Sequence, residues 1–139
     1  MLPYRRFEVI RKVRESGSVV SLYLKRADNA PLIEFKPGQH MMFKFQIPGR
    51  DIPEFRYYSF TDRFHTDYYR VSIKKEIPPI QSLSVPAGLC SSYICDQICE
   101  GMILEAKGPS GDFCIVPAEN DPVALIAGGI RITPILSML

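Results

Sequence analysis

The chain has 139 residues, of which 46% are hydrophobic and 23% are charged, so it can form one folded domain and is not a disordered protein. A net charge of +2 is too small to indicate a nucleic-acid partner, and no segment reaches the ~18 apolar residues of a membrane span. The start of the chain lacks the apolar core of a signal peptide. We therefore expect a cytoplasmic protein whose four cysteines are reduced thiols.

Short segments rich in β-branched and aromatic residues, several of them alternating between apolar and polar, predict six strands. They cover residues 7–13, 19–25, 41–47, 55–60, 69–75 and 102–107. A short helix is predicted over 91–99, where Ile94 and Ile98 share a face and Gly101 follows. Because turn signals separate the strands at roughly ten-residue spacing, the fold class is all-β, a six-stranded antiparallel Greek-key barrel.

The last part of the chain changes character. Residues 123–127 form a continuous apolar run, which predicts a strand buried on both faces. Gly128 and Gly129 follow, and a helix is predicted to begin near Thr133, so the order is that of a parallel α/β unit. One such unit cannot form a sheet by itself. We expect a barrel domain over 1–118 and the truncated start of an α/β domain over 119–139, with the apolar segment 123–139 docked on the barrel, self-associated with another copy or disordered.

The fourth predicted strand carries three side chains with complementary chemistry. Alternation places Arg56 and Tyr58 on one face, and Ser59 lies at the strand end. A guanidinium is a planar fork of donors that suits a phosphate, a tyrosine ring can lie against another aromatic ring, and a serine hydroxyl can bond a ring nitrogen. Taken alone, such a strand is more often an ordinary combination of surface and core.

Two further segments are candidates for binding an anion. Gly88 precedes the predicted helix, whose free N–H groups and positive dipole end favour an anion such as a pyrophosphate. Ser91 or Ser92 can bond a phosphate oxygen there, and an ordinary N-cap explains them equally well. The loop from Gly128 to Pro134 lies between a predicted strand and a predicted helix, which is the context of a phosphate-binding loop.

In combination these segments resemble the ferredoxin–NADP reductase superfamily over about residues 5 to 139. The similarity is greatest to the reductase modules of flavohaemoglobins and bacterial oxygenases. The matching motifs are Arg-x-Tyr-Ser at Arg56, Tyr58 and Ser59; a Val-Ser-Val-Lys-like strand at Val71, Ser72, Ile73 and Lys74; Gly-x-x-Ser at Gly88 and Ser91; Pro-x-Gly-Asp-Phe at Pro109, Gly111, Asp112 and Phe113; Gly-Gly-x-Gly-x-Thr-Pro at Gly128, Gly129, Thr133 and Pro134; and a Pro-Gly-Gln turn at Pro37, Gly38 and Gln39.

The resemblance implies a flavin site and assigns roles within it. Arg56 would contact the flavin diphosphate, Tyr58 would pack on the isoalloxazine or ribityl chain, and Ser59 would approach the flavin N5. The backbone of 71–74 would hold the flavin edge, and the helix start at 88–92 would cradle a pyrophosphate, which favours FAD over FMN. The implied catalytic residues are Ser59 and Tyr58. The implied cofactor-binding residues are Arg56, Tyr57, Tyr58, Ser59, Val71, Ser72, Ile73, Lys74, Gly88, Leu89, Cys90, Ser91 and Thr133.

The implied activity is that of an NAD(P)H-dependent flavoprotein reductase, which passes electrons from NAD(P)H through FAD to a haem or iron–sulfur acceptor. The alternative is a non-catalytic flavin-binding subunit that transfers electrons or regulates a larger complex. Arg131 stands where the family loop has Gly, so ordinary nucleotide binding is not expected at this loop, although a guanidinium can meet a phosphate directly. The spacing of Cys90, Cys95 and Cys99 differs from plant-type iron–sulfur sites, so no metal site is predicted.

Overall fold

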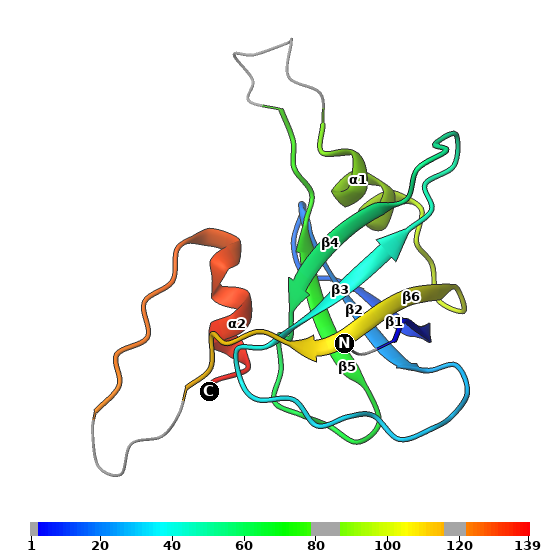
Figure 1. Cartoon of the computed structure of the whole chain (residues 1–139). Helices are drawn as coiled ribbons and strands as arrows, with labels where there is room; N and C mark the ends of the chain where they lie inside the picture. Colours follow the sequence, from blue (N-terminus) through cyan, green and yellow to red (C-terminus); the bar gives the residue numbers. More distant parts are fainter. Residues whose placement is uncertain (1–2, 79–86, 116–121) are drawn as a thin grey trace.

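The computed structural model describes residues 3–78, 87–115 and 122–139 (Figure 1). The six strands predicted for the barrel are all formed, and the predicted short helix begins two residues earlier than expected. The strands are β1 (Arg5–Arg14), β2 (Val19–Arg26), β3 (His40–Phe45), β4 (Glu54–Ser59), β5 (Tyr69–Lys74) and β6 (Ile103–Ser110); the helices are α1 (Leu89–Asp96), the 3-10 turn η1 (Gly129–Arg131) and α2 (Ile132–Leu136).

The six strands form one antiparallel sheet in the order β4-β3-β6-β1-β2-β5. Strand β6, the last in the sequence, lies between β1 and β3. It therefore joins the pair of β3 and β4 to the group of β1, β2 and β5. The sheet curls into a barrel that no continuous strand pairing closes. Its edge strands β4 and β5 approach each other at a single bridge between Phe60 and Val71. The predicted fold class is confirmed, with an open seam between β4 and β5.

Alternation along the strands fills the inside of the barrel with apolar side chains. Val9, Leu24 and Val71 are fully buried, and the rings of Phe35 and Phe60 stack with centroids 3.8 Å apart. Full burial of such side chains is worth about 1.5–3 kcal/mol each. The barrel is therefore a packed core, and ligands must bind on its outside or at its seam.

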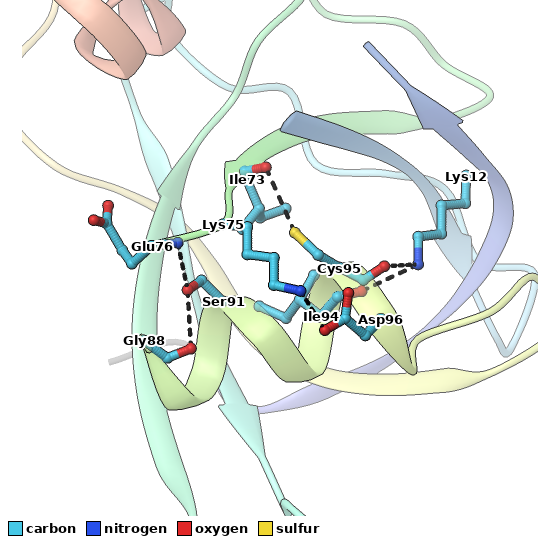
Figure 2. Close-up of polar contacts among 9 residues, drawn as sticks. All are labelled: Lys12, Ile73, Lys75, Glu76, Gly88, Ser91, Ile94, Cys95 and Asp96. Atoms are coloured by element: carbon cyan, nitrogen blue, oxygen red, sulfur yellow. Dashed lines mark hydrogen bonds and ion pairs between the residues drawn. The ribbon is translucent and has the colours of Figure 1, made fainter. Parts of the chain in front are cut away.

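Helix α1 packs beside β5 and is fixed to the barrel at its C-terminal end (Figure 2). The ammonium Nζ of Lys12 donates hydrogen bonds to three carbonyl oxygens, those of Ile94 (3.2 Å), Cys95 (2.7 Å) and Ile98 (2.7 Å). Ile94 and Cys95 are in the last turn of α1 and Ile98 lies just beyond it, where the unpaired C=O groups and the negative end of the dipole favour a cation. A side chain on β1 therefore caps a helix that is more than 80 residues away in sequence.

The prediction of a buried strand at 123–127 is wrong. These residues form no strand, and the side chains of Val123 and Ile126 are 62% and 92% exposed. A strand of this kind is stabilised by parallel neighbours on both sides, and within the described ranges no strand lies beside it.

The helix predicted after this run does form, as η1 followed by α2. Gly129 makes the first turn with φ +58°, a conformation that glycine adopts readily. The far end is tied to the barrel because the N–H of Gly38 donates to the Ser137 hydroxyl at 2.8 Å. Of the three expectations for 123–139, docking on the barrel therefore holds for the η1–α2 segment.

Candidate cofactor-binding site

A cavity of about 530 Å³ lies at the seam between β4 and β5. It is bounded by those two strands, the N-terminal tip of α1 and the η1–α2 segment, which Figure 1 shows beside the barrel. Its volume is in the ordinary range for small-molecule and cofactor sites. The lining residues are Arg56, Tyr57, Tyr58, Ser59, Ser72, Lys74, Glu76, Gly88, Leu89, Cys90, Ser91, Ile130, Arg131, Thr133 and Pro134.

Of the cofactor-binding residues that the resemblance implies, the cavity brings together all except Val71 and Ile73. These two are 0% and 2% exposed, because alternation along β5 turns them into the core and leaves Ser72 and Lys74 toward the cavity. The role predicted for Val71 and Ile73 belonged to their backbone, which burial of the side chains does not affect. Ser92 was also expected at the helix tip, but it is not among the lining residues.

The β4 wall carries a cation and an aromatic ring. The guanidinium of Arg56 is paired with Glu54 (Nη2 to Oε2, 2.9 Å) and its side chain remains 46% exposed, so further N–H donors are open to a ligand. Tyr58 packs partly on the core, with its ring 5.8 Å from that of Phe43. Burial raises the pKa of the Tyr58 hydroxyl well above its ordinary value, so the side chain is a neutral aromatic ring beside the positively charged guanidinium of Arg56.

The β5 wall is fixed by buried hydroxyl groups. The Ser72 hydroxyl lies 2.7 Å from the Ser21 hydroxyl and donates to the Thr61 hydroxyl at 3.0 Å. Both contacts lie on the face of β5 opposite the core, so the Ser72 hydroxyl is engaged within the chain and fixes the cavity side of β5 to β2 and to Thr61. Lys74 follows on the same face and adds a second cation to the lining.

The tip of α1 is locked to the end of β5 (Figure 2). The Ser91 hydroxyl accepts the N–H of Glu76 at 3.0 Å and donates to the carbonyl of Gly88 at 3.1 Å. The N–H of Gly88 donates to the carbonyl of Glu76 at 3.0 Å. A side chain at position 88 would place its Cβ 2.6 Å from both Glu76 Cβ and Ser91 Oγ, so only glycine allows this approach.

These contacts determine which groups of the helix tip are available to a ligand. The Ser91 hydroxyl is engaged within the chain and Ser91 is 8% exposed, so the residue offers a ligand its backbone rather than its hydroxyl. The first N–H groups of an α-helix have no intrahelical acceptor, and the dipole adds positive potential there. Cys90 lies among them, and burial raises the pKa of its thiol to about 11, which keeps it neutral.

Three cations and one carboxylate line the cavity, which favours an anionic ligand. The cations are Arg56, Lys74 and Arg131, and the carboxylate belongs to Glu76. The predicted site set did not include Glu76, Ile130, Arg131 or Pro134. Ile130, Arg131 and Pro134 lie in the glycine loop that the sequence had indicated, whereas Glu76 carried no signal of its own.

These features fit FAD. A diphosphate needs cationic forks and free N–H groups, which Arg56 and the α1 tip provide, and a flavin ring needs a flat apolar neighbour, which Tyr58 provides. A single cavity joins these groups, so one molecule can contact all three.

Residues 6–115 match the sequence profile of the oxidoreductase FAD-binding domain. The chain belongs to this family. The predicted superfamily and the predicted cofactor, FAD, are thereby confirmed, while the role of each residue toward FAD remains a proposal. Of the residues described, no helix is long and apolar enough to cross a membrane. The structure has its four cysteines as free thiols, and the described ranges hold no cluster of three His, Cys, Asp or Glu side chains suited to a metal ion.

Known proteins similar to this chain are oxidoreductases. It is 39% identical over 136 residues to a flavohemoprotein of Oceanobacillus iheyensis, a match that covers 98% of this chain and 32% of the relative. The chain thus spans about a third of the length of the curated relatives it matches.

Two solved structures have the same fold. The flavohem-like FAD/NAD binding domain of nitric oxide dioxygenase from Vibrio cholerae superposes with a TM-score of 0.86 at 32% identity, covering 96% of this chain and 54% of that one. Phthalate dioxygenase reductase superposes with a TM-score of 0.74 at 25% identity, covering 97% of this chain and 38% of that one.

Proposed function

We propose that this chain is the FAD-binding module of an NAD(P)H-dependent reductase that delivers electrons to a haem or iron–sulfur acceptor. The observation that carries the proposal is the single cavity shared by Arg56, Tyr58 and the α1 tip. The similar flavohemoprotein is named for flavin and haem together, and phthalate dioxygenase reductase is described as a modular structure for electron transfer from pyridine nucleotides to a 2Fe-2S centre. These relatives support both classes of acceptor.

Within this proposal each wall of the cavity has its own task. The Arg56 guanidinium and the N–H groups of residues 89–91 bind the diphosphate, and Lys74 adds positive potential nearby. Tyr58 packs against the flavin as a neutral plate, and Ser59, at the end of β4, places its hydroxyl toward the reactive edge of the ring. The bound FAD would supply the redox chemistry, accepting two electrons from a nicotinamide and passing them on singly.

The proposal extends to the organisation of the protein. Residues 1–118 form the FAD-binding domain, and 119–139 are the start of the nucleotide-binding domain. The free thiols fit a reducing compartment such as the cytoplasm. The exposed apolar side chains of Val123 and Ile126 make self-association through 123–139 part of the proposal.

The first test is a titration of the 139-residue chain with FAD, followed by quenching of flavin fluorescence. We expect Arg56→Met to weaken FAD binding about tenfold or more, because a charged bidentate contact to the diphosphate is lost. Arg63→Met is the matched control, since Arg63 is exposed on a loop outside the cavity. Equal FAD affinities for Arg56→Met and the wild type would refute the proposed site.

A second measurement separates the reductase from the non-catalytic electron-transfer or regulatory subunit. FAD bound to the chain is mixed anaerobically with NADH or NADPH, and loss of the flavin absorbance is followed in time. Saturable reduction by either nucleotide supports the reductase. We expect little such reduction from this chain under either reading, because residues 119–139 are only the start of the proposed nucleotide-binding domain, so saturable reduction is the outcome that would exclude the alternative.

A further inference from the structure

Arg131 reaches the cavity from the η1–α2 segment, which is a different part of the chain from the β4 and α1 walls. Its backbone position is well defined, because the N–H of Arg131 donates to the Gly128 carbonyl at 3.2 Å. The other end of the segment is anchored by the Ser137 hydroxyl, which is buried and accepts the N–H of Gly38. Arg131 is therefore held beside the cavity and is not a residue on a free tail.

The charges around Arg131 favour an anion from outside the chain. Arg56 has a carboxylate partner in Glu54, whereas no described carboxylate forms an ion pair with Arg131. Arg131 shares the cavity with Arg56 and Lys74, and Glu76 is the only acidic side chain among the described residues of the lining. Like charges gathered in one cavity raise its positive potential.

We propose that Arg131 is a further cofactor-binding residue, whose guanidinium contacts the diphosphate of FAD from the η1–α2 wall. This inference rests on the proposed function, in which FAD occupies the cavity. The diphosphate is the anionic group of oxidised FAD, so it is the group that an unpaired guanidinium in this cavity would bind. FAD would then bridge Arg56 on β4 and Arg131 on the C-terminal segment, and its binding would tie the η1–α2 segment more firmly to the barrel.

The test compares FAD with riboflavin, which has the same ring and ribityl chain but no phosphate. Affinities of both compounds are measured by flavin fluorescence for the wild type, Arg131→Met, Arg131→Lys, Arg56→Met and the control Arg63→Met. We expect Arg131→Met to weaken FAD binding roughly tenfold and to change riboflavin binding less than about twofold. Arg131→Lys keeps the positive charge but loses the paired N–H donors of the guanidinium. Its FAD affinity should therefore lie between those of the wild type and Arg131→Met.

A second readout follows the segment itself. Amide hydrogen exchange over residues 129–136 should slow when FAD is added to the wild type, and slow much less in Arg131→Met. Thermal melting of each apoprotein shows whether the variants are folded. If Arg131→Met is not folded, the FAD affinity of Arg131→Lys is compared with that of the wild type instead.

The outcomes separate this inference from the proposed function. Unchanged FAD affinity in Arg131→Met, together with weakened affinity in Arg56→Met, overturns the role of Arg131 and leaves the proposed site standing. Equal losses of FAD and riboflavin affinity also overturn it, because the diphosphate would then not be the group contacted. If the wild type binds no FAD, or Arg56→Met binds it normally, both proposals fall.

Discussion

Cys90 shows how burial changes the chemistry of a single side chain at the cavity. The thiol is 2% exposed, and removal from water raises its pKa from 9.0 to about 11, although the charge of Arg56 acts in the opposite direction. A thiol reacts as its thiolate, so Cys90 is a small neutral surface beside the proposed flavin and is not a nucleophile. Cys99, in contrast, is exposed.

Alkylation with iodoacetamide at pH 8 should therefore modify Cys99 rapidly and Cys90 slowly in the folded protein. At that pH a rise of two pKa units lowers the thiolate fraction roughly a hundredfold, and burial slows access further. Peptide mass spectrometry over a time course measures the two rates, and the unfolded chain is the control in which both cysteines should react alike. Comparable rates in the folded protein would contradict the burial of Cys90.

The residues of the candidate site could be predicted from sequence to different degrees, for physical reasons. Arg56, Tyr58 and Gly88 lie in motifs whose spacing reflects the ligand, so the sequence identified them, and the cavity unites them. Glu76 could not be identified, because the contacts between the end of β5 and the α1 tip bring it to the cavity. That contact joins two segments whose proximity no local pattern reveals.

Helix α1 is stabilised mainly by contacts to other elements. A helix of eight residues is marginal in isolation, and this one has no side-chain N-cap bond. Lys12 caps its C-terminal end from β1, and Lys75 on the chain after β5 pairs with Asp96 (2.6 Å). The sequence predicted the helix from its apolar spacing, but the Lys12 cap could not be predicted, since it depends on how the barrel brings β1 to the helix end.

Lys12→Met should destabilise the protein while keeping the apolar stem of the side chain. Three charge-assisted hydrogen bonds to carbonyls at and just beyond the helix end are lost, for an expected loss of about 1–3 kcal/mol in the free energy of unfolding. Lys36→Met, at an exposed turn, is the control and should stay within about 0.5 kcal/mol of the wild type. Urea denaturation followed by circular dichroism measures both, and equal stabilities of the two variants would exclude the cap.

Gly88→Ala tests the close approach of the α1 tip to β5. Its φ of −60° and ψ of 109° suit alanine, so any effect comes from the added Cβ, which would lie 2.6 Å from Glu76 Cβ and from Ser91 Oγ. The tip must shift, and we expect about 1–3 kcal/mol less stability and roughly tenfold weaker FAD binding.

The control for this change is Gly17→Ala, because a Cβ at Gly17 meets no atom within 4 Å. Alanine there should leave FAD affinity unchanged and stability unchanged or slightly increased. If Gly88→Ala binds FAD as tightly as Gly17→Ala does, the tip does not depend on glycine and its contact with the ligand is in doubt.

At the scale of the molecule, the alternating strands of the barrel were predictable from the sequence, whereas the conformation of residues 123–127 was not. The apolar run is typical of a strand inside a parallel sheet, but that pattern says nothing of where the neighbouring strands come from. The alternating strands of the barrel, by contrast, obtain their partners within residues 5–110. The run is left exposed, and exposed apolar segments tend to find a partner surface.

We therefore expect the 139-residue chain to self-associate through residues 123–139 in a concentration-dependent way. Sedimentation velocity over a range of protein concentrations measures this, and Ile126→Lys should weaken the association about tenfold or more, because its 92% exposed side chain would be buried at the contact. Ile52→Lys is the matched control, since Ile52 is also an exposed isoleucine but lies on the β3–β4 loop. Both variants add the same positive charge, so a difference between them reports the location of the contact and not the net charge. A wild type that stays monomeric at the highest concentration, or two variants that associate alike, would show that the apolar run is not the contact surface.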